Sequence, residues 1–288
     1  MSKLQQPVIG YTLGDQAGIG PEVIEKALPH LDRNAEYRPM GGRIPAIPGQ
    51  PTEATARAAL EQLECAAEAL KEGVIDAVVT APICKEGLHR LGFRFPGQTE
   101  FFAARLGVKD FAMCLTGRRL TVALATTHVA LKEVPELLKS EELVRVGMLL
   151  SDFLKRIGTP HPRIALAGLN PHNGESGAFG CEESGIIAPA VKTLQGKVPG
   201  VFHGPCVPDC VYRDAAEGRY DAVVAPYHDQ ALIPLKLLDF DNAVNATLGL
   251  PRLRVSPDHG TAFGIAGKGV ANPSSTIRAF ELARRSVE

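Results

Sequence analysis

The sequence predicts an α/β protein in which helices cover both faces of a mixed, largely parallel sheet, an α/β/α sandwich. Two observations predict this class. Short runs rich in Val, Ile, Leu and Ala recur along the chain, and amphipathic stretches of helical length separate them. Continuous apolar strands that alternate with helices are typical of strands buried on both faces. A chain of 288 residues can also form two lobes that share one fold, for which we predict no boundary.

The apolar runs give the expected strands, at residues 8–13, 75–81, 120–127, 163–169 and 221–227. The expected helices lie at about 20–29, 52–72, 140–156, 182–195 and 273–286. The second helix has a proline near its start and a glycine at its end, which are common boundary residues. Residues 34–51 are rich in Pro and Gly and show no periodicity, so we expect a loop there.

Charge and composition favour a small-molecule partner. The 31 basic and 32 acidic residues leave a net charge of -1, which argues against a nucleic-acid-binding or acidic-membrane-binding surface. The first fifteen residues resemble no secretory leader, and no apolar segment reaches the length that spans a membrane. The six cysteines are scattered, which is typical of free thiols in a reducing compartment. We therefore expect a cytoplasmic protein.

Histidines follow three of the five apolar runs, each within a few residues. They are His128, His172 and His228. The carboxyl ends of parallel strands line one edge of a sheet, where ligands bind, so we expect these three imidazoles to converge. Neutral imidazoles coordinate Zn, Co, Ni or Fe, and three of them leave open positions for a substrate. Each histidine taken alone is more often a structural residue, but their shared position favours a catalytic metal site.

Two aspartates accompany these histidines. Asp229 follows His228 directly, and Asp209 lies in the segment GPCVPDC. Each could be a further metal ligand, a carboxylate that orients an imidazole, or a base. A turn or helix-cap role is the alternative for both.

Other segments offer anion and ligand contacts. Residues 14–23 join the first strand to a helix, so their backbone N–H groups could hold an anion, although an ordinary turn explains them equally well. Residues 258–277 contain four glycines before the last helix, which is typical of a loop that wraps a ligand. Lys236, Asn245 and Arg254 could bind a phosphate or carboxylate, with each charge-assisted hydrogen bond contributing roughly 1.5–3 kcal/mol. Solvated surface cations are the alternative.

Seven segments together resemble a known family. They are GDQAGIGPE, PGQTEFF, LATTH, GLNPHNGESG, YHDQALIPLK, NATLGLP and DHGTA. In this order they are similar to the motifs of the 4-hydroxythreonine-4-phosphate dehydrogenase (PdxA) family, from about residue 8 to 285. The segment HGTAFGIAGKGVANP is also similar to the nicotinamide-cofactor loop of isocitrate and isopropylmalate dehydrogenases. The resemblance implies their fold, with two lobes and the active site in the cleft.

The resemblance also implies an activity and its residues. The activity is the NAD-linked oxidation and decarboxylation of 4-phosphohydroxy-L-threonine to 3-amino-2-oxopropyl phosphate, a step in pyridoxal phosphate biosynthesis that requires a divalent ion such as Zn, Mg, Co or Mn. The implied metal ligands are His128, His172 and His228, and the implied catalytic residues are Asp209, His172 and Lys236. The implied substrate contacts are Gln98, Thr99, Lys236, Asn245 and Arg254. The implied cofactor contacts are His259, Gly260, Thr261, Gly267 and Asn272. Asp229 and Gln230 are expected to orient the site.

Members of this family are homodimers with a shared metal site. The resemblance therefore implies that His228 meets His128 and His172 of the partner subunit. The implied substrate is a small phosphorylated molecule.

Three departures from the family pattern, and one from the related dehydrogenases, affect these expectations. Gln98 stands where a substrate-contacting histidine is usual, and Cys84 replaces another histidine. The region 30–50 is shorter than usual by at least one strand and helix, so the sheet would lack an edge element. Gly264 stands where the related dehydrogenases have an acidic residue that would exclude a 2'-phosphate, so NADP is an alternative to NAD, the cofactor that the resemblance implies.

Two other functions are compatible with these departures. One is a related enzyme that oxidises another substrate, either 4-phospho-D-threonate or 4-phospho-erythronate, or an aromatic cis-dihydrodiol carboxylate. The other is a non-catalytic homologue that binds a metal or a ligand.

Overall fold

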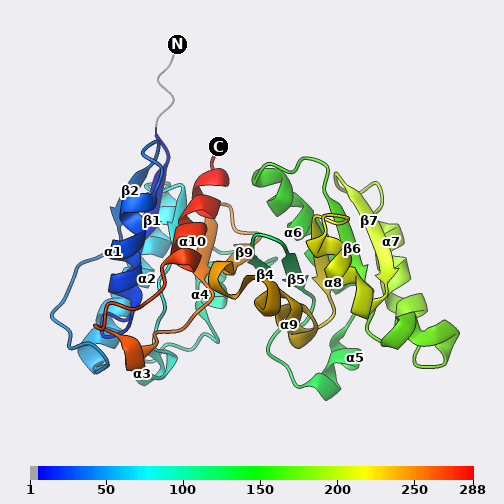
Figure 1. Cartoon of the computed structure of the whole chain (residues 1–288), viewed down its shortest axis with the longest axis horizontal. Helices are drawn as coiled ribbons and strands as arrows, with labels where there is room; N and C mark the ends of the chain where they lie inside the picture. Colours follow the sequence, from blue (N-terminus) through cyan, green and yellow to red (C-terminus); the bar gives the residue numbers. More distant parts are fainter. Residues whose placement is uncertain (1–5) are drawn as a thin grey trace, which may run out of the picture. The chain divides into compact units, whose positions relative to one another are not determined.

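The computed structural model describes residues 6–288, which form two compact units (Figure 1). Unit 1 consists of Met1–Lys109 and Val244–Glu288, and unit 2 consists of Asp110–Ala243. Residues 1–5 lie outside the described residues. They begin the fifteen-residue segment for which no secretory leader is expected. Unit 1 is thus built from both ends of the chain, and unit 2 from its middle.

In unit 1 five strands pair in the order β2-β1-β3-β10-β9. The strands are β1 (Val8–Tyr11), β2 (Glu36–Pro39), β3 (Ala77–Val79), β9 (Val244–Leu248) and β10 (Leu253–Pro257). Strands β2, β1, β3 and β10 pair in parallel, whereas β9 is antiparallel to β10. The helices of this unit are α1 (Gly20–Ala27), α2 (Glu53–Glu72), α3 (Lys85–Arg90), α4 (Gln98–Arg105) and α10 (Ser274–Arg285).

Two groups of helices pack on the sheet of unit 1. Helix α10 contacts β1, β3, β9 and β10 and packs against α1, while α2 packs against β3, α3 and α4. Helix α2 begins with a capping box between Thr52 and Thr55, and it ends at Gly73, whose left-handed conformation (φ 76°) closes the last turn.

In unit 2 five strands pair in the order β4-β5-β8-β6-β7. Its strands are β4 (Ala112–Thr116), β5 (Thr121–Leu124), β6 (Arg163–Ala167), β7 (Val201–Cys206) and β8 (Ala222–Ala225). Only the β4–β5 pair is antiparallel among these pairings. The helices are α5 (Val134–Leu137), α6 (Ser140–Arg156), α7 (Ala188–Leu194), α8 (Pro208–Ala216) and α9 (His228–Asp239). Side chains of α8 and α9, among them Tyr212 and Leu235, close the core over β5 and β8.

The predicted fold class is confirmed, and all five predicted strands and all five predicted helices occur. The prediction of a loop over residues 34–51 was wrong in part, because Glu36–Pro39 form β2 and pair with β1 at the edge of the sheet. This strand is partly exposed and polar, so it has no apolar signal. The sheet therefore has an edge strand at this position, contrary to the expectation.

All six cysteines are free, as predicted. In the part of the chain that the structure describes, no helix combines the length and the apolar character needed to cross a membrane.

Candidate active site

The predicted metal-binding histidines follow three adjacent strands of unit 2. His128 lies after β5, His172 after β6, and His228 is the first residue of α9 after β8. Strands β5, β8 and β6 are parallel neighbours, so the three residues share one edge of the sheet. The rings of His128 and His228 lie 5.6 Å apart, centroid to centroid. The structure thus brings two of the three together within one chain, and residues 6–288 contain no group of three metal-ligand side chains.

Carboxylates orient two of these imidazoles. The Nδ1 of His228 lies 2.6 Å from Oδ1 of Asp229, and the Nδ1 of His172 lies 3.1 Å from Oε2 of Glu175. A carboxylate on Nδ1 directs the proton there and leaves Nε2 as the nitrogen that can bind a metal. This donor set fits a divalent cation that prefers imidazole. Of the roles considered for Asp229, the geometry favours that of the orienting carboxylate.

The backbone around His172 is strained. Four non-glycine residues adopt left-handed φ values between 44° and 58°: His172, Asn173, Glu175 and Ser176. Each such residue costs roughly 1–3 kcal/mol, and such conformations are concentrated at functional sites. The surroundings must therefore hold this segment in place.

Glu183 holds the chain just before His172. One oxygen of its carboxylate accepts hydrogen bonds from the backbone N–H groups of Leu169 (2.8 Å) and Asn170 (2.7 Å). Burial acts to raise the pKa of Glu183, but these N–H groups and the Asn170 side chain outweigh it and lower the pKa. The charged carboxylate therefore fixes the backbone of Leu169 and Asn170, directly before the strained segment.

Two cavities adjoin the histidines. A cavity of about 770 Å³ is lined by His172, Asp209, Asp229 and Gln230, among others. A smaller one, of about 340 Å³, is lined by His128, His228 and Asp229, among others. Because Asp229 lines both, the three histidines and Asp209 surround adjoining spaces.

Gln230 fixes one wall of the larger cavity. It accepts a hydrogen bond from the Tyr212 hydroxyl at 3.0 Å, and its Nε2 donates to the carbonyl of Gly168 at 2.8 Å. Both ends of this amide are therefore used to join the start of α9 to α8 and to the end of β6. This agrees with the orienting role expected for Gln230.

Arg254 is a buried cation in unit 1. The residue is 3% exposed on β10, and its guanidinium donates to Thr80 Oγ1 (2.9 Å), Asn245 Oδ1 (3.3 Å) and Gln98 Oε1 (2.9 Å). Within residues 6–288 all its hydrogen-bond partners are neutral. Burial lowers the pKa of Arg254 to about 9, although the charge of Glu100 acts in the opposite direction. Since a guanidinium has five N–H donors, an anion placed here would find both a charge and free donors.

Gln98 orients this guanidinium. Its Oε1 accepts from Arg254, while its Nε2 donates to the carbonyl of Ala81 at 3.3 Å. The neighbouring Thr99 shares a buried hydrogen bond of 3.2 Å with Thr247. The amide of Gln98 therefore holds Arg254 in place and adds no positive charge of its own. Lys236 lies on α9 of unit 2, two helical turns beyond His228.

The loop between β10 and α10 contains the predicted cofactor residues. A Cβ added at Gly260 or at Gly264 would meet no atom within 4 Å, so the backbone there is open to a ligand. The Nε2 of His259 is buried and has no hydrogen-bond partner among residues 6–288. The carbonyl of Thr261 accepts from the backbone N–H of Ile19 at 2.9 Å. Open backbone and an unused ring nitrogen fit a polar cofactor.

Comparison with known proteins identifies the family. The family model described as pyridoxal phosphate biosynthetic protein PdxA matches residues 19–283. The chain belongs to the PdxA family. A 4-hydroxythreonine-4-phosphate dehydrogenase of Methylorubrum populi is 46% identical over 272 residues, which cover 92% of this chain and 76% of that relative. A D-threonate 4-phosphate dehydrogenase of Pectobacterium atrosepticum is 40% identical, covering 96% of this chain and 98% of that relative.

Solved structures agree with this membership. The crystal structure of a 4-hydroxythreonine-4-phosphate dehydrogenase from Klebsiella pneumoniae has a TM-score of 0.84 at 37% identity, covering 98% of this chain and 100% of that one. An isocitrate dehydrogenase from Methylococcus capsulatus, 14% identical with a TM-score of 0.50, shares the fold. The predicted PdxA family and the predicted isocitrate dehydrogenase-like fold are confirmed.

Two residues of this PdxA chain's site were missed by the sequence analysis. Thr80 accepts a hydrogen bond from Arg254, and Glu183 holds the approach to His172. Thr80 lies near the end of the predicted strand 75–81 and directly after the observed β3, so its position at the strand end was a usable signal. Glu183 lies in no such position, and its sequence context offers no signal.

Proposed function

We propose that this PdxA chain oxidises and decarboxylates 4-phosphohydroxy-L-threonine with NAD, yielding 3-amino-2-oxopropyl phosphate. The observation that carries the proposal is Arg254, a buried cation whose hydrogen-bond partners among the described residues are all neutral. A buried charge without a counter-ion is costly, and a phosphate would relieve that cost through charge-assisted hydrogen bonds. The family and the names of its members supply the reaction class.

His128, His172 and His228 would hold a divalent ion. The ion would supply Lewis-acid assistance, both to the oxidation of the substrate hydroxyl and to the loss of CO2. Zn, Mg, Co and Mn are the candidates. The carboxylates of Asp229 and Glu175 keep two of these imidazoles oriented, with Nε2 as the binding nitrogen.

Asp209 and Lys236 complete the proposed set of polar groups. Asp209 lines the same cavity as His172. In the proposed reaction it would accept the proton of the substrate hydroxyl. Lys236, Asn245 and Arg254 are proposed to bind the substrate phosphate. Thr99 is proposed as a further substrate contact. Asn245 lies beside Arg254, and a second cation on the substrate would help to fix its orientation.

The cofactor would bind at the loop between β10 and α10. His259 would use its unpartnered Nε2, and Thr261 and Asn272 would use their side chains. Gly260 and Gly267 would let the backbone approach the dinucleotide closely. NAD is the proposed cofactor, with NADP as the alternative to be tested beside it.

We further propose a homodimer whose subunits share the metal site. Three large apolar side chains are exposed around α9, spaced as on one helix face: Ile233 (67%), Leu237 (84%) and Phe240 (70%). Ile233 and Leu237 also line the cavity that contains His172. A second copy seated on this face would cover apolar surface and bring its own groups to the metal site.

Mixing of inactive variants tests the shared site. His172→Ala and His228→Ala should each lose bound metal and turnover. If ligands come from two subunits, dissociating and reassociating the two variants together should restore about a quarter of the wild-type activity, because half the dimers would carry one intact site of two. No recovery would contradict the shared site, and full metal content in His172→Ala would contradict the metal assignment.

The reaction is tested with purified protein, 4-phosphohydroxy-L-threonine, NAD and each of the four metals. We expect NADH to form in the presence of metal and to be lost on chelation. A parallel series with NADP ranks the two cofactors by kcat/KM. Absence of reduced cofactor with every metal would contradict the proposal.

A second candidate substrate is 4-phospho-D-threonate. It is suggested by Gln98, which departs from the family pattern, and by the similarity to the D-threonate 4-phosphate dehydrogenase of Pectobacterium atrosepticum. Ranking both compounds, 4-phospho-erythronate and an aromatic cis-dihydrodiol carboxylate by kcat/KM decides between them. Metal binding without turnover of any of these would instead support the non-catalytic homologue. The cytoplasmic location stays a prediction.

A further inference from the structure

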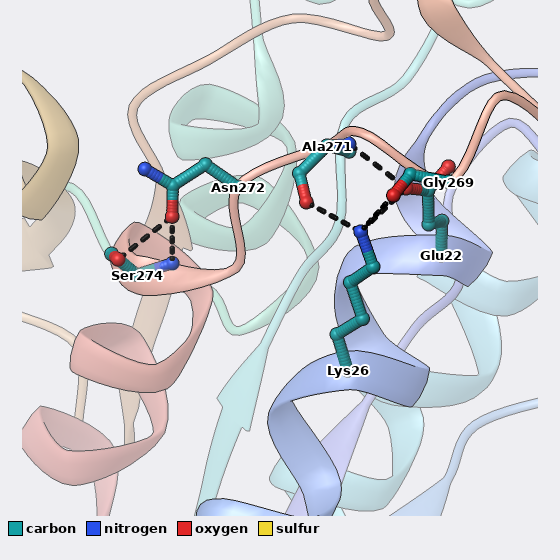
Figure 2. Close-up of polar contacts among 6 residues, drawn as sticks. All are labelled: Glu22, Lys26, Gly269, Ala271, Asn272 and Ser274. Carbon is teal, nitrogen blue, oxygen red and sulfur yellow. Dashed lines mark hydrogen bonds and ion pairs between the residues drawn. The ribbon is translucent and has the colours of Figure 1, made fainter.

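The cofactor loop is held on one side by two charged side chains of α1, Glu22 and Lys26, here called the α1 clamp (Figure 2). The Nζ of Lys26 donates to Glu22 Oε1 (2.8 Å), to the carbonyl of Gly269 (2.8 Å) and to the carbonyl of Ala271 (2.9 Å). The same Glu22 oxygen accepts from the backbone N–H of Ala271 at 2.8 Å. An ammonium has three donors, so Lys26 is fully used by this arrangement.

The electrostatics of the clamp favour its charged form. Burial acts to raise the pKa of Glu22, but the hydrogen bonds from Lys26 and from the Ala271 N–H lower it overall. Glu22 is therefore a carboxylate at neutral pH. Charge-assisted hydrogen bonds are the stronger class, so Gly269 and Ala271 are firmly tied to α1.

The clamp sets the position of Asn272, a predicted cofactor contact. Asn272 follows Ala271 directly, and its Oδ1 accepts from both the backbone N–H (3.0 Å) and the hydroxyl (2.7 Å) of Ser274 at the start of α10 (Figure 2). Its Oδ1 is committed to α10, which leaves the Nδ2 to donate to a ligand. The direction of that donor depends on where the clamp holds Ala271.

A strap of residues 42–49 holds the other side of the loop. The Gln16 amide fixes the start of the strap, since its Nε2 donates to Gly42 O (3.0 Å) and its Oε1 accepts from Ile44 N (3.1 Å). At the far end, the N–H of Gly49 donates to Ala17 O at 2.7 Å. The strap thus runs along the 14–20 turn within the region that is shorter than the family pattern.

Pro48 of the strap also packs closely against Gly267 of the loop. Gly267 has a left-handed φ of 74°, and a Cβ added there would lie 2.7 Å from the Cβ of Pro48. Only a glycine fits against this proline. The segment from Gly267 to Asn272 therefore lies between a contact with the strap and hydrogen bonds to α1.

We propose that the α1 clamp and the strap fix this loop in the shape that receives the dinucleotide before it binds, and that Lys26 is a positioning residue for the cofactor. The inference rests on the proposed function, in which this loop binds NAD. A loop that is already ordered loses less conformational entropy on binding, which increases affinity. Lys26 acts through two backbone carbonyls and makes no contact with the reacting atoms.

Lys26→Met tests the clamp, because it keeps the aliphatic stem and removes all three donors. The matched control is Arg57→Met, since Arg57 forms an ion pair of the same i,i+4 spacing with Glu53 (2.7 Å) on the exposed face of α2. Binding of NAD to the full-length, metal-loaded protein is measured by titration calorimetry, and turnover is measured in parallel. For Lys26→Met we expect the Kd and the KM of NAD to rise about tenfold or more. Its kcat at saturating NAD and its KM for the phosphorylated substrate should stay within about twofold. Arg57→Met should bind NAD like the wild type.

Pro48→Gly is the second variant, and it loosens the strap without touching α1. It should raise the Kd of NAD in the same direction, because glycine adds backbone freedom. Wild-type affinity for NAD in both variants would overturn the inference, as would a lowered Tm of Lys26→Met with an unchanged Kd. If the wild-type protein bound neither NAD nor NADP, the proposed function would be overturned as well, so the two failures are distinct.

Discussion

Arg254 in unit 1 and His172 in unit 2 both have unused capacity to bind a ligand, but their surroundings differ. Arg254 is 3% exposed, and three neutral acceptors of the same chain fix its guanidinium. The side chain of His172 is 68% exposed, has one carboxylate partner and lies on a strained backbone. The proposed anion site is thus preformed within one chain, whereas the proposed metal site would gain its full ligand set only from a second subunit or on metal binding. Substitutions at the first should change substrate affinity, and those at the second should change metal content.

The largest effect is expected at Arg254. Arg254→Met removes the buried cation and at least two charge-assisted hydrogen bonds to the substrate, together roughly 3–6 kcal/mol. We expect kcat/KM for the phosphorylated substrate to fall about a thousandfold, with metal content unchanged. Steady-state kinetics and metal analysis check this. The kcat/KM of Arg254→Lys should lie between those of the wild type and of Arg254→Met, because lysine cannot bind the anion in a bidentate manner. A loss below tenfold would show that the anion binds elsewhere.

A smaller effect is expected at Asp229. Asp229→Asn replaces the carboxylate that orients His228 through Nδ1. Loss of such a partner typically reduces metal affinity about 10–100-fold. Competition with a chelator measures the metal Kd, with Asp241→Asn near the end of α9 as the control. Equal affinity in wild type and Asp229→Asn would mean that His228 needs no such partner.

Gln98 allows a test in the opposite direction, by adding a charge beside Arg254. Gln98→Glu places a carboxylate against the guanidinium at the position of an existing 2.9 Å hydrogen bond. The new carboxylate neutralises the buried charge of Arg254 within the protein. The interaction between the substrate anion and Arg254 therefore contributes less to binding. We expect the KM of the phosphorylated substrate to rise about tenfold while the Kd of NAD is unchanged. If KM did not change, Gln98 would have no influence on anion binding.

The smallest effect concerns pH and Glu183. Its pKa is lowered from 4.5 in the folded state, because backbone N–H groups outweigh the opposing effect of burial. A depressed folded-state pKa adds stability above about pH 4.5, and this is lost as the pH falls through the folded value. The Tm of Glu183→Gln should lie a few degrees below wild type at about pH 7, and the difference should shrink below about pH 4.5. Thermal melts across this range check it, and a constant difference would contradict the sign.

The strands that the sequence predicted are mostly continuous apolar runs, although it missed β4, whose sequence AMCLT is also apolar. Strands β3 and β8 are apolar throughout, and the histidine-after-strand rule found groups that share one edge of a sheet. The strands β9 and β10 were missed because Asn245, Thr247 and Arg254 interrupt their pattern, although all three are buried.

Other features left no signal in the sequence. Helix α9 contains Pro234, which usually indicates a helix end. The left-handed turn at His172 could not be predicted, since four of its five residues are not glycine. It exists because surrounding contacts such as those of Glu183 stabilise it, and those contacts connect residues through the fold.

The division of the chain into units has a consequence for biosynthesis. Unit 2 is one continuous segment, so every one of its strands has been synthesised before Val244 leaves the ribosome. Unit 1 instead cannot be completed until residues 244–288, which supply β9, β10 and α10, have been synthesised. During translation Thr80 and Gln98 are made long before the arginine they bind. The order of synthesis therefore lets the histidine-bearing unit fold first, and the surroundings of Arg254 are completed only when the segment that follows unit 2 has been made.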